Sequence, residues 1–177
     1  MYRKSTGFIL KRMNAREMDM TLVVFTQDFG KILLIAKGAQ KITSKRLPSL
    51  DRLSMVRIQF VEKSSYLYLR TVDLLSSLQS IKYDLTTRLL LLLVADILDG
   101  LLPMHQSEQE LFTRFKHYIR SLARGDVQVV TLAFLRDALS LLGYAQHDNK
   151  VTLNEIFHTL EELTQRDFHD RWRKLGL

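Results

Sequence analysis

Five short apolar segments in the first 72 residues constrain the fold of this chain more than any other feature. In the fourth, Val56, Ile58 and Phe60 alternate with Arg57 and Gln59, which predicts a strand with one buried and one exposed face. Short polar gaps favour antiparallel pairing of neighbours, and one long connection separates the third segment from the fourth. This arrangement favours a small closed barrel of the OB type, because closure leaves no exposed strand edge. The five segments are residues 6–12, 21–26, 31–36, 54–61 and 66–72.

The long connection after the third segment is strongly basic. The predicted strand breaks at Gly38, and no acidic residue lies between Gly30 and Asp51. A strand that ends in a cationic loop can neutralise the phosphates of a polyanion without an exact fit. The alternative is a solvated basic loop with no ligand, since runs of charge often serve only solubility. The cations of this loop are Lys37, Lys41, Lys45 and Arg46.

The predicted exposed face of the fourth and fifth strands carries both aromatic and cationic side chains. In the fifth segment, Leu67 and Leu69 alternate with Tyr66, Tyr68 and Arg70. Aromatic rings stack on the bases of single-stranded nucleic acid, at roughly 1–3 kcal/mol each, and cations meet its phosphates. This pattern predicts a nucleic-acid surface that also includes Arg57. The alternative is that both tyrosines pack beneath a second domain, with their hydroxyls hydrogen-bonded.

From about residue 81 the sequence changes from alternating to helical spacing. We therefore predict an α+β protein with an OB-fold nucleic-acid-binding domain at residues 1–80 and an α-helical domain at residues 81–177. The apolar run at residues 89–102 contains Asp96 and Asp99 and is too short to span a bilayer, so it predicts a buried helix. Helix starts are marked by Asp84, by Asp126, and by capping boxes at residues 107–110 and 152–155.

Charge is divided unevenly between the two predicted domains. Residues 1–82 contain 15 Lys and Arg against 6 Asp and Glu, a net charge of +9. Residues 83–177 contain 11 against 13, a net charge of −2. The basic partner surface is therefore predicted on the first domain. The chain has no Cys, which excludes disulfides and thiolate zinc sites and is typical of a reducing compartment.

No arrangement of residues in the sequence supports catalysis. The few glycines are single and lie at turns, so there is no phosphate-binding glycine loop. His158 and His169 are eleven residues apart, and no third His stands at the helical spacing of a metal site with either of them. We therefore expect a binding protein, not an enzyme, with no metal and no cofactor. A hydrolase would need a site that this sequence does not show.

Several short motifs occur together in one known family. They are Gly7-Phe8-Ile9-Leu10-Lys11-Arg12, Glu17 and Asp19, Phe25-Thr26, Gly30-Lys31, Ala36-Lys37-Gly38-Ala39 and Ser44. In this combination the chain resembles the RecO family of bacterial recombination mediators and DNA repair proteins. The resemblance is best over residues 1–80, and residues 139–145 look like the end of a helix in that family. Two departures are the missing Cys-rich zinc module and a chain that stops sooner than the family usually does.

The resemblance implies an N-terminal OB fold and a C-terminal helical domain. It implies binding of single- and double-stranded DNA, annealing of complementary strands, and help in loading a RecA-type recombinase. Its implied partners are RecR and the single-stranded DNA-binding protein, which offers an acidic C-terminal tail. A cytoplasmic, nucleoid-associated location without a membrane is expected, and the N-terminus lacks the apolar segment of a signal peptide.

Two functional hypotheses follow, and both can hold at once. In the first, the chain is a non-catalytic DNA-binding mediator in which cations hold phosphates and tyrosines stack bases. Its candidate DNA-binding residues are Lys11, Arg12, Arg16, Lys31, Lys37, Lys41, Lys45, Arg46, Arg57, Tyr66, Tyr68 and Arg70. In the second, the chain is an adaptor whose barrel is a scaffold and whose helical domain binds an acidic peptide tail. The candidate partner-binding residues are then Arg114, Arg120 and Arg124.

Overall fold

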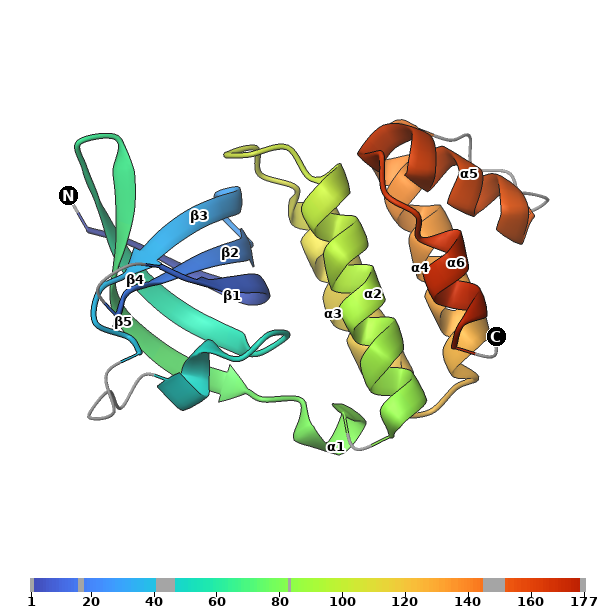
Figure 1. Ribbon diagram of the computed structural model, residues 1–177, viewed down its shortest axis with the longest axis horizontal. Helices are drawn as coiled ribbons and strands as arrows, with labels where there is room; N and C mark the ends of the chain where they lie inside the picture. The colour runs from blue at the N-terminus through green and yellow to red at the C-terminus, as the bar shows by residue number, and fades with distance from the viewer. Residues whose placement is uncertain (1, 16–17, 41–46, 83, 145–151, 176–177) are drawn as a thin grey trace. The chain divides into compact units, whose positions relative to one another are not determined.

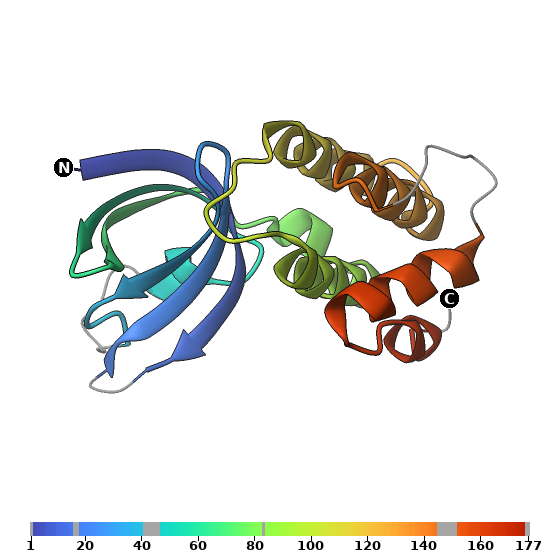
Figure 2. The same cartoon turned by 90° about the horizontal axis from the view of Figure 1, so that it is seen from above.

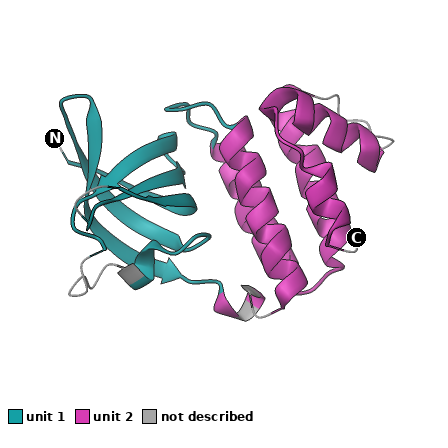
Figure 3. Ribbon diagram, in the orientation of Figure 1, with its two compact units in different colours: residues 1–78, 102–108 teal, residues 79–101, 109–177 magenta. Residues whose placement is uncertain are grey.

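The chain forms two compact units. The computed structural model describes residues 2–15, 18–40, 47–82, 84–144 and 152–175. One unit, here called the barrel unit, comprises residues 1–78 and 102–108, and the other, the helical unit, comprises residues 79–101 and 109–177 (Figure 3). The strands lie in the first unit and the long helices in the second, which confirms the predicted α+β class. The domain boundary placed after residue 80 stays a prediction.

Five strands close into a barrel in the order β1-β2-β3-β5-β4 (Figure 1). Neighbouring strands are antiparallel except β3 and β5, which run parallel with Leu34 opposite Leu67. This topology confirms the predicted OB-type barrel. The strands are β1 (Tyr2–Asn14), β2 (Met20–Thr26), β3 (Gly30–Ala36), β4 (Met55–Lys63) and β5 (Tyr66–Ser76), and a short 3₁₀ helix at Leu47–Leu50 precedes β4.

The predicted alternation buries one face of β4 and β5 inside the barrel. Val56, Ile58 and Phe60 are at most 2% exposed, and Leu67 and Leu69 are 8% and 4% exposed. These side chains pack with apolar residues of the other three strands into one core. The residues between them therefore point away from the core, so the polar side chains of β5 lie on the outer surface of the barrel.

The connection between α2 (Leu85–Leu101) and α3 (Gln109–Ser121) belongs to the barrel unit. The backbone N–H of His105 donates to the carbonyl oxygen of Lys31 at 2.9 Å, and the Ser107 hydroxyl donates to the carbonyl oxygen of Gln27 at 3.2 Å. Ser107 was expected to cap the next helix. That helix, α3, instead begins at Gln109, and the Ser107 hydroxyl bonds to the turn between β2 and β3.

Gly30 is required where this connection crosses the turn between β2 and β3. Its φ of +64° lies in the left-handed region that favours glycine. A Cβ atom at this position would lie 1.7 Å from the carbonyl oxygen of Gln106, which is far inside contact distance. A side chain here would therefore have to displace backbone, not another side chain.

The helical unit is built around α2 (Figure 2). The buried residues of this helix include Leu90, Leu93 and Ile97, whereas Leu85 and Leu89 on another side are exposed, and α2 packs against α4, α5 and α6. Within the described residues, no helix is long and apolar enough to cross a membrane. The helices are α1 (Gln79–Lys82), α2 (Leu85–Leu101), α3 (Gln109–Ser121), α4 (Val127–Leu141), α5 (Leu153–Thr164) and α6 (His169–Arg173).

Three predicted helix caps are confirmed. The Asp84 carboxylate accepts from the backbone N–H and the hydroxyl of Thr87, and the backbone bond is the main reason that the pKa of Asp84 is lowered. Asp126 accepts from two backbone N–H groups at the start of α4. Thr152 and Glu155 form a reciprocal capping box at the start of α5. Each cap satisfies N–H groups that the first turn of a helix leaves without a partner.

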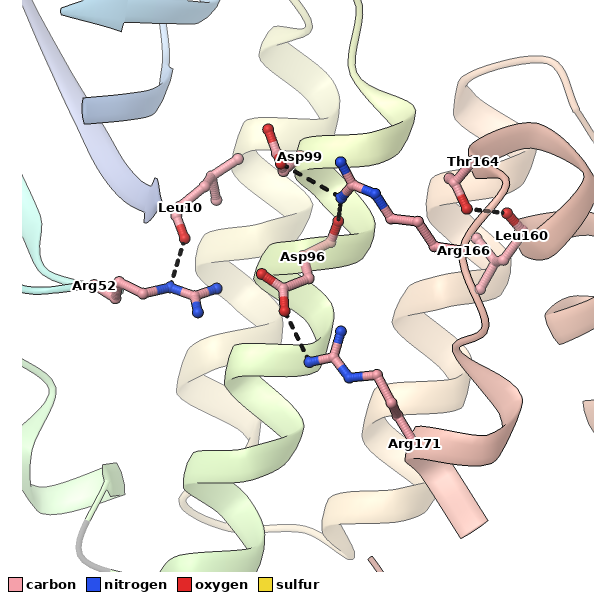
Figure 4. A network of polar contacts seen from close by, with 8 residues as sticks. All are labelled: Leu10, Arg52, Asp96, Asp99, Leu160, Thr164, Arg166 and Arg171. Atoms are coloured by element: carbon pink, nitrogen blue, oxygen red, sulfur yellow. Dashed lines mark hydrogen bonds and ion pairs between the residues drawn. The ribbon is translucent and has the colours of Figure 1, made fainter. Parts of the chain in front are cut away.

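The two carboxylates that interrupt the apolar run of α2 bind the C-terminal helices (Figure 4). Arg171 approaches the Asp96 carboxylate at 2.8 Å, and Arg166 donates to the Asp96 carbonyl oxygen at 3.2 Å. Arg166 also lies 3.4 Å from the Asp99 carboxylate. These contacts bind α6 and the chain just before it to α2. They explain why two acidic residues interrupt the apolar run of this helix.

Candidate nucleic-acid interface

A surface pocket of about 470 Å³ lies beside the turn between β4 and β5. Three of its six lining residues are cationic and none is acidic. We call it the hairpin pocket. Its lining residues are Lys37, Lys63, Ser64, Tyr68, Leu69 and Arg70.

The parallel pairing of β3 with β5 creates this pocket. Ile35 lies opposite Tyr68 in that pairing, and Lys37 follows two residues later, just beyond the end of β3. Since side chains two apart share a face, Lys37 emerges on the same side as Tyr68. Its ammonium nitrogen lies 5.3 Å from the centroid of the Tyr68 ring, within the range of a cation–π contact. A cation and an aromatic ring from distant parts of the sequence therefore meet.

The turn between β4 and β5 supplies the other wall of the pocket. Lys63 and Tyr66 face each other across it, and Ser64 and Ser65 form its two central residues. Both serines have positive φ values, 48° and 66°, as both central residues of a type I′ hairpin turn do. Non-glycine residues in this region are strained, and such strain is common where a segment serves a ligand.

The hairpin pocket is electropositive because its cations are not neutralised nearby. Among the described residues, no carboxylate forms an ion pair with Lys37, Lys63 or Arg70. Glu62, the acidic residue of this hairpin, is paired instead with Arg3 at 3.2 Å. A ligand that carries phosphate would therefore meet cations without a competing internal anion.

Only some of the residues predicted on the exposed face of β4 and β5 line the hairpin pocket. Tyr68 is half-buried and lines it, whereas Tyr66 is 58% exposed and does not. Arg57 is exposed but lies opposite Asp73, six residues before the turn, which is about 20 Å along the strand. Of the side chains predicted on this face, Tyr68 and Arg70 thus lie together at one end of the hairpin.

The other predicted cations of the barrel unit lie elsewhere. Lys11 is half-buried on β1, and Arg12 forms an ion pair with Asp51 at 2.6 Å. Lys31 is only 8% exposed, so its side chain does not offer a phosphate contact, and we leave it out of the proposed surface. The remaining four predicted cations, Arg16, Lys41, Lys45 and Arg46, lie outside the residues that the structure describes.

Sequence reasoning missed two residues of the pocket. Lys63 and Ser64 lie in the gap between the fourth and fifth predicted strands and are not among the predicted site residues. A signal was present, because a two-residue turn between Lys63 and Tyr66 places a cation directly opposite an aromatic residue. What the sequence could not show is that Lys37 approaches the same hairpin.

A smaller groove of about 240 Å³ lies between α3 and α4 in the helical unit. The rings of Tyr118 and Phe134 stack along it with centroids 4.6 Å apart, and burial raises the pKa of the Tyr118 phenol. Arg114 is at this groove, between the carboxylates of Glu110 at 3.7 Å and Asp137 at 3.8 Å. The other two predicted partner-binding residues, Arg120 and Arg124, are exposed but do not line the groove.

A closed five-stranded barrel with a basic, aromatic pocket, followed in sequence by a helical bundle, defines an OB-fold protein with a helical C-terminal part. Two family models match the chain: recombination protein O N terminal over residues 1–78, and recombination protein O C terminal over residues 82–150. The chain belongs to the RecO family, which confirms the resemblance found in the sequence.

Curated relatives agree with this assignment. The chain is 29% identical over 143 residues to the DNA repair protein RecO of Clostridium acetobutylicum, an alignment that covers 80% of this chain and 58% of the relative. It is 26% identical over 153 residues to that of a Thermoanaerobacter species, covering 84% and 61%. For Koribacter versatilis the identity is 28% over 173 residues, covering 95% and 68%. The chain thus spans about three fifths of the length of the first two relatives.

Proposed function

We propose that this protein binds single- and double-stranded DNA through its barrel unit and acts in DNA repair as a non-catalytic recombination mediator. In this role it anneals complementary strands and helps to load a RecA-type recombinase, with RecR and the single-stranded DNA-binding protein as partners. Membership of the RecO family supports the proposal. The observation that carries it is the hairpin pocket, where Tyr68 and three cations that pair with no described carboxylate line the same cavity.

The pocket suits a nucleotide because it offers a stacking surface and phosphate contacts together. Tyr68 is held in the barrel wall by the buried residues on either side of it, so its ring loses little freedom on binding. Lys37 covers the ring, but an exposed cation–π contact contributes only about 0.5–1 kcal/mol. A stacked base contributes roughly 1–3 kcal/mol, so it can take the ring while Lys37 moves to a phosphate.

The same geometry predicts how binding depends on salt. Each cation that neutralises a phosphate of a single strand contributes about 0.7 to the slope of log affinity against log salt. The three cations of the hairpin pocket alone therefore account for a slope of about −2. Further cations of the basic connection, outside the described residues, would make the slope steeper.

The test is a salt titration of binding to short labelled oligonucleotides, single- and double-stranded, followed by fluorescence anisotropy. A single-stranded oligonucleotide with abasic sites is the control, since it has the same phosphates and lacks the bases. We expect affinity to fall steeply with salt and the abasic strand to bind more weakly at every salt concentration. No binding at low salt would overturn the proposal, and equal binding of the abasic strand would remove stacking from it.

A DNA partner also suggests where the protein acts. We propose a cytoplasmic, nucleoid-associated location, because the barrel unit would be held on DNA by its cations. Fluorescence microscopy of a tagged chain, before and after DNA damage, tests this. A diffuse signal that ignores the nucleoid would contradict it.

A second candidate function is suggested by the groove between α3 and α4. Its apolar rings and Arg114 suit the hydrophobic and acidic residues of a peptide tail, although two carboxylates already flank Arg114. A pull-down with the single-stranded DNA-binding protein, with and without its acidic tail, tests this adaptor role. Capture that survives both tail removal and Arg114→Ala would exclude the groove.

A further inference from the structure

One acidic residue joins the loop between β1 and β2 to the chain that leaves β3. The Asp19 carboxylate accepts a hydrogen bond from the backbone N–H of Gly38 at 2.6 Å. The carbonyl oxygen of Asp19 accepts from the side-chain amide of Gln40, and the backbone N–H of Gln40 donates to the carbonyl oxygen of Met18 at 2.9 Å. The first residues of the basic connection are thus bonded to this loop at several points.

These bonds fix the direction in which the chain leaves β3. Gly38 has a φ of +62°, so the chain turns sharply directly after Lys37. The carboxylate of Asp19 holds the peptide group between Lys37 and Gly38 by a charge-assisted bond, which is stronger than a bond between neutral groups. Lys37 is therefore presented toward the Tyr68 ring.

We infer that Asp19 is a positioning residue for DNA binding, which acts by holding Lys37 at the hairpin pocket and does not itself contact DNA. The inference rests on the proposed function. It predicts that removing Asp19 lowers the affinity for DNA. The opposite would be expected from charge alone, because a carboxylate beside a DNA surface repels phosphates. If Asp19 acted only through its charge, its removal would strengthen binding. If it positions Lys37, removal of its acceptor oxygen weakens binding.

Three substitutions separate the two effects. Asp19→Asn removes the charge and keeps an acceptor oxygen, so affinity for a single-stranded oligonucleotide should equal or exceed that of the wild type. Asp19→Ala removes both, and we expect an affinity several-fold lower, with a salt slope smaller by about 0.7, the share of one cation. Asp19→Glu keeps the charge but displaces the acceptor by one methylene, and should resemble Asp19→Ala. This third substitution keeps the test decisive if the alanine variant fails to fold.

A double-mutant cycle shows whether the effect runs through Lys37. In a Lys37→Ala background, Asp19→Ala should cost no further affinity, because the side chain that it positions is gone. A general loss of barrel structure would instead weaken binding in both backgrounds. A 2-aminopurine base in the oligonucleotide adds a spectroscopic signal, since its fluorescence responds to stacking and should change less with Asp19→Ala.

The outcomes distinguish this inference from the proposed function. If the wild-type chain binds no oligonucleotide at low salt, the proposed function fails and the inference fails with it. If the wild type binds and Asp19→Ala binds equally well or more tightly, only the inference is overturned. If Asp19→Asn weakens binding as much as Asp19→Ala, a neutral acceptor oxygen at this position does not hold Lys37, and the inference as stated is overturned.

Discussion

Three arginines of the helical unit and the cations of the hairpin pocket are used in opposite ways. In the helical unit, Arg166 and Arg171 are paired with carboxylates of α2, and Arg114 lies between two more. In the hairpin pocket, no described carboxylate pairs with Lys37 or Arg70. Cations of the first kind hold helices together, whereas those of the second kind have no carboxylate partner among the described residues.

The barrel unit does form ion pairs, but they lie apart from the lining of the hairpin pocket. Arg3 pairs with Glu62, and Arg12 pairs with Asp51. Asp19 is used differently again, since its carboxylate accepts from a backbone N–H group. The excess of positive charge in the first half of the sequence is therefore not an average property of its surface. Among the described residues, the three cations of the hairpin pocket are one place where this charge gathers without a carboxylate partner.

The largest effect should come from removing the unpaired cations. We expect the triple substitution Lys37→Ala, Lys63→Ala and Arg70→Ala to weaken DNA binding by roughly 100-fold at low salt and to reduce the salt slope by about 2. The matched control removes the same charge from the helical unit by Arg114→Ala, Arg120→Ala and Arg124→Ala, and should bind DNA like the wild type. Equal losses in the two triple variants would break the comparison.

A smaller effect should follow from loss of the aromatic ring. Tyr68→Ala is expected to cost about 1–3 kcal/mol, or roughly 5- to 150-fold in affinity, because a stacked base loses its platform. Tyr68→Phe keeps the ring and should bind normally. Tyr66→Ala, in the exposed residue outside the pocket lining, should have little effect. The loss at Tyr68 should disappear with an abasic oligonucleotide, and its persistence there would show that the ring supports structure and not bases.

The strands and helices could be predicted from the sequence, because each of their patterns involves only a few neighbouring residues. The alternation of β4, the Asp84 and Asp126 caps and the Thr152–Glu155 capping box all act over a few neighbouring positions. The closed barrel followed from counting five such strands and one long connection. The resemblance to the RecO family gave the same prediction of an OB barrel followed by a helical domain.

The hairpin pocket could not be predicted, since it depends on the register between strands far apart in sequence. Tyr68 and Lys37 meet only because β3 pairs with β5 at Ile35. Contacts between distant parts of the chain also decide which cations are unavailable: Arg12 pairs with Asp51, 39 residues away. Lys31 is bridged to Met104, in the connection that returns from α2. Composition revealed how many cations there are, but only tertiary structure shows which remain unpaired.

In the helical unit, removing a paired cation should affect stability and not DNA binding. Arg171→Ala should lower the free energy of unfolding by at most about 1 kcal/mol, since the pair with Asp96 is partly exposed and screened by solvent. Trp172 is the only tryptophan of the chain and is 1% exposed, so its fluorescence reports urea unfolding of this unit. Unchanged DNA affinity is the second readout, and a loss of affinity would contradict the division of roles.

The smallest effect concerns a carboxylate whose partner is the backbone. The N–H of Thr152, and then its hydroxyl, lower the pKa of Glu155 below its ordinary value of 4.5. A lowered pKa means that the bond stabilises the fold at pH values above 4.5, and that this contribution is lost as the pH falls through the lowered value. Urea unfolding followed by Trp172 fluorescence, from pH 7 to pH 3, should therefore show a small loss of stability in acid. Glu155→Gln can still complete the capping box, so it should reduce the acid-dependent part and leave the loss due to other carboxylates.

Because this capping bond joins the carboxylate to an uncharged backbone group, added salt should alter it less than it alters the Arg171–Asp96 pair. Equal sensitivity to salt in the two cases would show that Glu155 acts through a cation instead.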